Sequence, residues 1–172
     1  MQPDSSYFIR SATEVDIPEM YLISAHAHLA GYEHLIPHSG RADFDRHYAI
    51  NAKNSARYIN TMRSRIRDPR WHIWVAERDG HVVGYTLAHK PDDEHLFKKG
   101  LFVSPKLQGH GIGAALLRAS LQIIEHGIIE LVVIEANHRA RRLYEKNGFV
   151  IVGPSEKSFF GARQVVMRIH RP

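Results

Sequence analysis

The sequence contains no cysteine among its 172 residues. This absence excludes disulfide bonds, thiolate ligands for a metal and a thiol nucleophile. The chain also lacks any run of ~18–20 apolar residues, the length that a membrane-spanning helix needs. Its first residues, MQPDSSYFIR, lack the apolar core of a signal peptide. We therefore expect a cytoplasmic protein with no membrane association.

Histidine is abundant, with 13 residues, but no H-E-x-x-H or similar spacing is present. We therefore predict no metal site. Four histidines gather at His26, His28, His34 and His38, and the first two cannot share one helix face because they are two residues apart. We favour surface or loop positions for them, with a role in a substrate pocket as the alternative. Residues 30–44 are where we expect substrate contacts, because loops border clefts.

The formal net charge is +5 and the isoelectric point is near 9.6, so the chain attracts anions. Basic residues are densest at 139–146 and 63–70, but they form no long tract and no aromatic residues alternate with them. We therefore expect no nucleic-acid partner, and we predict a solvated helix face for residues 63–70. The length and the 44% hydrophobic content fit one globular domain, residues 1–172.

The first half of the chain predicts a short strand, helices and a strand meander. Asp16 is a candidate cap for a helix with Pro18 in its first turn. Gly31, Pro37 and Gly40 indicate a loop. An apolar alternation around Asp79-Gly80 predicts a hairpin. The predicted elements are a strand at 7–10, a helix at 17–30, a loop at 31–40, one or two polar helices at 43–66, and strands at 71–77, 81–89 and 96–103.

The second half predicts a helix, a buried strand, a second helix and two strands. Apolar residues recur at helical spacing from Ile112 to Ile123, and we expect Gly127 to stop that helix. The β-branched run at 128–135 predicts a strand buried on both faces. A short helix at 138–146 with a glycine cap follows, and FVIVG and RQVVMRIH predict the last strands. The order indicates a mixed α/β fold with one strand–helix–strand crossover.

Three glycines at every second position distinguish the stretch QGHGIGAALL, which starts at Gln108. Gly109, Gly111 and Ala114 match the dinucleotide fingerprint G-x-G-x-x-A, and Glu135 lies about where a ribose-binding carboxylate is expected. Two features oppose that match: SPKLQ separates the glycines from the strand, and few residues remain for further crossovers. A plain turn rarely needs three glycines. A pyrophosphate site at the start of a helix explains them better.

The stretch LFVSPKLQGHGIGAALL resembles the acetyl-CoA signature Q/R-x-x-G-x-G/A of the GNAT superfamily of N-acetyltransferases. A second stretch, NHRARRLYEKNGF, resembles that family's N-x-x-A-x-x-x-Y-x-x-x-G-F segment. The resemblance covers residues 71–172, and residues 1–70 correspond to the variable acceptor side. It implies a twisted, mixed, mostly antiparallel sheet of about six to seven strands flanked by helices, with a splayed cofactor-binding strand pair. The matching residues are Gln108, Gly111, Gly113, Asn137, Ala140, Tyr144, Gly148 and Phe149.

The resemblance implies that acetyl-CoA and an amine acceptor are the partners, and a homodimer is an expectation at family level. Backbone groups of the splayed strand would contact pantetheine, and an N–H near its end would polarise the thioester carbonyl. Asn137 would contact pantetheine or cap its helix, and Arg142 and Arg139 would reach the phosphates or remain solvated. The implied pantetheine residues are Leu101, Phe102 and Val103, and the pyrophosphate amides are those of Gln108, Gly109, His110, Gly111, Ile112, Gly113 and Ala114.

The resemblance makes Tyr144 the candidate general acid for the departing thiolate, with an aromatic packing role as the alternative. Candidate bases for the amine are Glu94 and His95, with Glu77 and Glu135 behind them. Lys98 and Lys99 stand where many relatives have an acidic residue or histidine, which points to an anionic group on the acceptor. The resulting prediction is an acetyl-CoA-dependent N-acetyltransferase with direct transfer in a ternary complex. The alternatives are a CoA-binding sensor without turnover and a dinucleotide-binding protein, and the sequence leaves the acceptor open.

Overall fold

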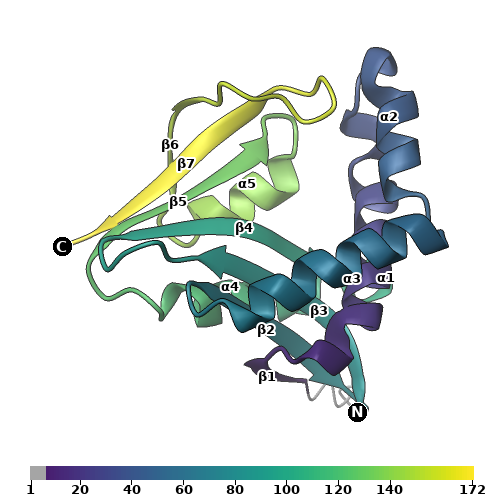
Figure 1. Ribbon diagram of the computed structural model, residues 1–172. Helices are drawn as coiled ribbons and strands as arrows, with labels where there is room; N and C mark the ends of the chain where they lie inside the picture. Colours follow the sequence, from purple (N-terminus) through teal and green to yellow (C-terminus); the bar gives the residue numbers. More distant parts are fainter. Residues whose placement is uncertain (1–6) are drawn as a thin grey trace, which may run out of the picture.

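A computed structural model describes residues 7–172. Residues 1–6, part of the N-terminal stretch considered above, lie outside the described residues. Seven strands form one sheet in the order β1-β2-β3-β4-β5-β7-β6 (Figure 1). Every neighbouring pair is antiparallel except β4 and β5, which are parallel. The strands are β1 (Phe8–Ser11), β2 (Trp71–Arg78), β3 (His81–His89), β4 (His95–Val103), β5 (Gly127–Ile134), β6 (Val150–Pro154) and β7 (Gln164–Arg171).

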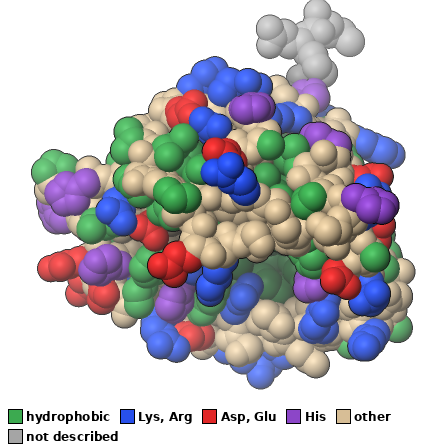
Figure 2. Space-filling view, turned by 90° about the horizontal axis from the view of Figure 1, so that it is seen from above, with side chains coloured by type: hydrophobic (Ala, Val, Ile, Leu, Met, Phe, Trp, Pro, Cys, Tyr) green, Lys and Arg blue, Asp and Glu red, His purple; other side chains and the backbone are tan. Residues whose placement is uncertain are grey.

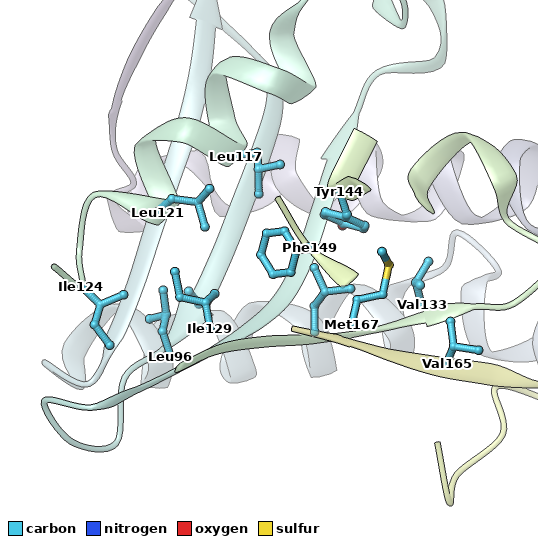
Figure 3. Close-up of a cluster of buried hydrophobic side chains, with 12 residues drawn as sticks. Leu96, Leu117, Leu121, Ile124, Ile129, Val133, Tyr144, Phe149, Val165 and Met167 are labelled. Atoms are coloured by element: carbon cyan, nitrogen blue, oxygen red, sulfur yellow. The ribbon is translucent and has the colours of Figure 1, made fainter. Parts of the chain in front are cut away.

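Five α-helices cover the two faces of this sheet unequally. On one face, Met20 of α1 and Met62 of α3 pack with Tyr85 and Leu87 of β3. On the opposite face, α4 and α5 cover the sheet from β1 to β7, and Figure 3 shows the cluster that α5 completes with Tyr144. The helices are α1 (Ile17–Gly31), α2 (His38–Tyr48), α3 (Ala52–Arg67), α4 (Ile112–Leu121) and α5 (His138–Glu145), with 3₁₀ turns η1 (Glu14–Asp16), η2 (Glu33–Leu35) and η3 (Pro105–Leu107).

The mixed sheet with flanking helices confirms the predicted fold class. The hairpin prediction is also confirmed, because Asp79 and Gly80 both have positive φ, at 53° and 78°, as a type I′ turn requires. Within residues 7–172, no helix has the length and apolar character needed to cross a membrane.

Two glycines were predicted to break structure and instead permit close backbone approach. Gly40 lies inside α2, which begins at His38, so the predicted loop at 31–40 is wrong at its end. A Cβ there would collide with the carbonyl oxygen of Phe160. Gly127 begins β5 and does not end α4, which stops at Leu121; a Cβ there would collide with the carbonyl oxygen of Glu94.

Two further predictions are corrected by tertiary contacts. Asp16 does not cap α1, because its carboxylate accepts hydrogen bonds from Arg10 and from the amide of Thr13. The strand predicted to be buried on both faces is fully covered on only one, where Leu131 and its alternate neighbours are buried. On the other face Val132 is 46% exposed, although Ile134 at the end of the strand is buried. The exposed part of β5 lies on the same side of the sheet as α1 and α3.

Candidate functional site

The two parallel strands separate at the centre of the sheet. β4 pairs with β5 only from His95↔Ile128 to Lys98↔Leu131. Beyond that point β4 stays paired with β3 as far as Val103, and β5 stays paired with β7 as far as Ile134. The edge of β4 that faces β5 therefore has no strand partner over residues 101–103, and neither has the facing edge of β5. This gap exposes the strand segment of Leu101, Phe102 and Val103, the residues that the resemblance assigned to pantetheine.

A helix N-terminus lies beside the gap. The first backbone hydrogen bond of α4 runs from the amide of Ala115 to the carbonyl of Gly111 at 3.0 Å. The amides of Ile112, Gly113 and Ala114 thus have no carbonyl to bind within the helix, and the positive end of the helix dipole lies behind them. Such a terminus is suited to a phosphate group.

The glycines of this loop are required by backbone conformation. Gly109 and Gly111 have φ values of 94° and 81°, which favour glycine. An added Cβ would meet no atom within 4 Å at Gly109 and only the Tyr7 hydroxyl, at 3.6 Å, at Gly111. Among the described strands β4 and β5 form the single parallel pair, so the repeated crossovers of a dinucleotide-binding fold are missing.

Side chains around the loop mostly brace it. The Gln108 amide nitrogen donates to the carbonyl of Val103 at 3.3 Å, and its oxygen accepts from Arg139 of α5. His110 contacts the carbonyl of Leu107 through Nδ1 at 3.2 Å. Arg142 is exposed on α5. Arg139 is therefore engaged in connecting α5 to the loop, whereas Arg142 keeps its head free in solvent.

Tyr144 points from α5 into the cluster drawn in Figure 3, with its ring 5.7 Å from that of Phe149. Burial, with a smaller effect of the nearby Tyr32, raises the pKa of Tyr144 above its usual range, so the phenol keeps its proton at neutral pH. No hydrogen bond from its hydroxyl occurs within residues 7–172. Asn137 at the start of α5 accepts from the amide of Ala140 at 3.1 Å, which is the capping role that the sequence offered as one alternative.

Aromatic side chains from α1, α2 and β4 pack together at the far side of the gap. His28 of α1 stacks on Tyr48 at 3.9 Å between ring centroids and lies 4.8 Å from the ring of Phe102. Its Nδ1 donates to the carbonyl of Ser24 at 2.7 Å, and burial lowers the pKa of His28 to about 4. The prediction of a surface or loop position is wrong for His28. Ile17, Met20 or Tyr21, Ser24 and His28 follow one another at intervals of three or four residues. This spacing would have placed His28 on the buried face of α1.

The proposed bases do not lie with these residues. His95 begins β4, seven residues from Phe102, so the two are about 23 Å apart along an extended strand. Its Nδ1 contacts Asp92 at 2.8 Å, and Glu94 precedes it in the exposed turn. The expectation that Glu94 and His95 act as bases at the gap conflicts with this placement, because the strand direction carries them to its opposite end.

Glu77 and Glu135 are engaged elsewhere, in ion pairs with Arg10 at 2.7 Å and Arg163 at 3.4 Å. The part of the chain that the structure describes contains no group of three or more His, Asp or Glu side chains able to hold a metal ion.

Sequence reasoning missed the burial of Lys98, at the last rung of the β4–β5 pairing. Its side chain is 5% exposed, and Nζ donates to the carbonyl of Gly100 at 2.9 Å and to the hydroxyl of Thr86. Burial lowers the pKa of Lys98 to about 7. A bulge at Lys99, which has no partner on β3, follows directly.

Two clefts lie beside the helices. The larger, of about 620 Å³, is lined by residues 34–37, 134–136 and 161–163 with His138 and Arg141. Residues 34–37 fall in the segment where substrate contacts were expected. The smaller, of about 320 Å³, lies between α1 and α3. Figure 2 shows a hollow with hydrophobic side chains on its floor and several Lys and Arg side chains around it.

Comparison with known proteins gives a consistent result. A model described as the acetyltransferase (GNAT) family matches residues 37–149. An uncharacterized N-acetyltransferase of Mycobacterium tuberculosis is 36% identical over 103 residues, 58% of this chain and 64% of that protein, so the chain spans less than two thirds of that relative. The L-amino acid N-acetyltransferase AaaT of Escherichia coli is 28% identical over 145 residues, 73% of this chain and 88% of that protein. The crystal structure of PaiA N-acetyltransferase from Thermoplasma acidophilum, in complex with coenzyme A, superposes with a TM-score of 0.74 at 16% identity, covering 96% of this chain and 99% of that one.

Proposed function

The chain belongs to the acetyltransferase (GNAT) family, and from that membership we propose that it transfers an acetyl group from acetyl-CoA to an amine. The observation that carries the proposal is the gap between β4 and β5 beside the free amides at the start of α4. The gap offers a backbone edge to an extended amide chain, and the helix start offers donors to a pyrophosphate. The two features are adjacent, as one long ligand with both groups would require.

These residues fit acetyl-CoA. The edge of Leu101, Phe102 and Val103 would hold pantetheine, and the loop from Gln108 to Ala114 would hold the pyrophosphate, with Arg142 and Asn137 of the α5 region close by. When bound, acetyl-CoA supplies an acetyl group activated as a thioester. A backbone N–H near Phe102 or Val103 polarises the carbonyl, and the preorganised donor is what makes this contribution large.

Tyr144 serves as the general acid in this proposal. Its phenol is protonated at neutral pH and its hydroxyl is not engaged by another described residue, so it is free to give its proton to the departing sulfur. Transfer to the amine is direct, because the chain has no cysteine to carry the acetyl group. The amine loses its proton to water, since Glu94 and His95 lie at the other end of β4.

A titration and a kinetic assay test the proposal. Calorimetry with acetyl-CoA should detect binding, and release of free CoA should follow when an amine is added. Tyr144→Phe should lower kcat by about 100-fold, at the lower end of what an acid–base residue contributes, while acetyl-CoA affinity stays the same. No binding at millimolar acetyl-CoA would refute the proposal. Tight binding with no CoA release across a broad amine panel would instead support the sensor alternative.

A further inference from the structure

The carbonyl of Gly100 is held by two buried side chains where β4 leaves β5. Nζ of Lys98 donates to the carbonyl oxygen at 2.9 Å, and the hydroxyl of Thr86 on β3 donates to the same oxygen at 2.8 Å. Lys98 also donates to the Thr86 hydroxyl. The Lys98 side chain is 5% exposed and Thr86 is fully buried. One peptide oxygen therefore accepts from two side chains that solvent scarcely reaches.

A β-bulge brings Lys98 to this carbonyl. Lys98 pairs with Ala88 and Gly100 pairs with Leu87, so Lys99 is left without a partner on β3. An extra residue of this kind bends a strand and changes the direction of its side chains. The pairing between β4 and β5 also ends at Lys98. The bulge and the two side-chain donors therefore coincide with the start of the gap.

The ladder between β3 and β4 shows which way the peptide groups of the unpaired segment point. The amide of Ser104 donates to the carbonyl of Val83 at 2.9 Å, which makes these residues a hydrogen-bonded pair. Such pairs recur at every second residue of an antiparallel ladder. Phe102 and Gly100, two and four residues before Ser104, therefore direct their N–H and C=O groups toward β3.

Leu101 and Val103 have the opposite direction. Their backbone groups point away from β3 and into the gap, where β5 is no longer paired with β4. The side-chain amide of Gln108 donates to the carbonyl of Val103 at 3.3 Å, which agrees with this direction. The donor proposed for the thioester carbonyl is thereby narrowed to the N–H of Leu101 or Val103. That of Leu101 is nearer to the point where the strands separate.

The N–H of Leu101 and the carbonyl of Gly100 belong to one peptide group. Hydrogen bonds in a chain polarise one another, so a peptide that accepts strongly at its oxygen donates more strongly at its N–H. Lys98 and Thr86 both donate to the oxygen of this peptide. A charged ammonium polarises a carbonyl more than a neutral donor does. The effect of the two side chains is thus delivered to the first N–H that faces the gap.

Stability does not account for an amine at this position. The sheet neighbours of Lys98 belong to the apolar cluster of Figure 3, and within residues 7–172 Lys98 forms no ion pair. Burial therefore lowers the pKa of Lys98 to about 7. Tyr144, the titratable member of that cluster, keeps its proton. Buried groups with a shifted pKa are typical of functional sites. The cluster side chains from β3, β5, α4 and α5 include Ala88, Leu131, Leu117, Leu121 and Tyr144.

We propose that Lys98, together with Thr86, is a positioning residue for acetyl transfer. The two side chains orient and polarise the peptide between Gly100 and Leu101, and its N–H stabilises the negative charge that develops on the thioester oxygen as the amine attacks. The inference rests on the proposed function and adds to it a side chain that acts through the backbone. Lys98 itself does not touch the substrate.

Infrared spectroscopy of bound acetyl-CoA tests this polarisation without an acceptor. The thioester carbonyl is isotopically labelled, and its stretching frequency is compared between an aprotic solvent and the complex. Hydrogen bonding lowers this frequency, so the parent complex should show a downward shift. In Lys98→Met the shift should be smaller by about 10–30% at pH 9, which is the strengthening that one hydrogen bond gives its neighbour. At pH 6, where Lys98 carries its charge, the loss should be larger.

The pH dependence of turnover gives a second measure. CoA release is followed with the fastest amine of the panel, and kcat of the parent is divided by kcat of Lys98→Met. The ratio should be about 10-fold at pH 6, below the loss of about 100-fold that follows removal of such a donor. It should fall as the pH rises through 7, because Lys98 then loses its charge. A ratio that does not depend on pH would indicate a structural role and overturn the proposal.

Variants of two neighbouring residues supply the controls. Lys99→Met removes the same charge from the adjacent residue, which is exposed with Nζ 5.0 Å from the ring centroid of Phe97, and it should leave the carbonyl band unchanged. Thr86→Val should reproduce part of the loss, and Thr86→Ser should restore the band. Equal bands in the parent and Lys98→Met, or an equal effect of Lys99→Met, would overturn the role of Lys98 and leave acetyl transfer standing. Failure of the parent to bind acetyl-CoA would overturn both proposals.

Discussion

Lys98→Met is expected to stabilise the protein at neutral pH, although it removes a hydrogen-bonded residue. The Lys98 side chain is buried at the last rung between β4 and β5, and Nζ donates to the carbonyl of Gly100 at 2.9 Å. That carbonyl also accepts from the hydroxyl of Thr86 at 2.8 Å. Methionine has a similar shape, and after the change the Gly100 carbonyl keeps a donor. The substitution thus leaves no unsatisfied polar group.

The magnitude follows from the pKa of the buried amine. Burial lowers the pKa of Lys98 from 10.5 to about 7, and at about 1.4 kcal/mol per unit this shift is worth about 5 kcal/mol. Between pH 7 and 10.5 the unfolded chain binds a proton that the folded protein does not, so the free energy of unfolding rises with pH. Below pH 7 the full cost is present. Subtracting about 1 kcal/mol for the lost hydrogen bond, Lys98→Met should be more stable by about 4 kcal/mol near pH 6.

Urea unfolding at half-unit steps from pH 6 to 10 measures this difference. The gap between Lys98→Met and the parent should shrink as pH rises and vanish near pH 10, because the parent gains up to about 1.4 kcal/mol per pH unit. Lys106→Met, which removes an exposed lysine from the turn after β4, should run parallel to the parent at every pH. A constant difference between Lys98→Met and the parent would show that Lys98 is not a neutral buried amine.

Three further substitutions, one of them a control, probe the gap from its two sides. Gly111→Ala should lower the free energy of unfolding by about 1–2 kcal/mol because φ is 81°, and it should weaken acetyl-CoA binding by calorimetry. Gly113→Ala, in the first turn of α4 with room for a Cβ 3.5 Å from Leu101, should not reduce stability, and equal losses would contradict the conformational argument. Burial lowers the pKa of His28 to about 4. As the pH falls from 6.5 to 4, the unfolded chain therefore binds more protons than the folded protein does, and the free energy of unfolding drops by about 3 kcal/mol. His28→Phe should remove this acid dependence in urea unfolding, and an unchanged dependence would mean that His28 is accessible to protons.

The sequence predicted the sheet and the glycine-rich loop before α4 because those features are local. A hairpin needs only Asp79-Gly80 between alternating strands, and a pyrophosphate site needs only glycines with positive φ before a helix. Both signals lie within a dozen residues. The backbone supplies the binding groups, so they follow from the order of elements and not from distant side chains.

The other side of the site was not predictable in this way. His28, Phe102 and Tyr48 meet from three separate elements, and no spacing in the sequence encodes that meeting. Glu94 and His95 were named as candidate bases for the amine. The direction of β4, however, fixes which end of it faces the gap, and only the pairing of the folded sheet shows this.

Near the start of α4 an anion can be attracted by backbone amides and by basic side chains. The helix start that faces the proposed pyrophosphate attracts an anion through backbone amides, so the net charge of +5 need not be concentrated there. Arg139 instead braces Gln108, whereas the exposed side chains of Lys106, Arg118 and Arg142 form no ion pair within residues 7–172. These exposed cations add a long-range attraction for an anion to the short-range donors at the start of α4.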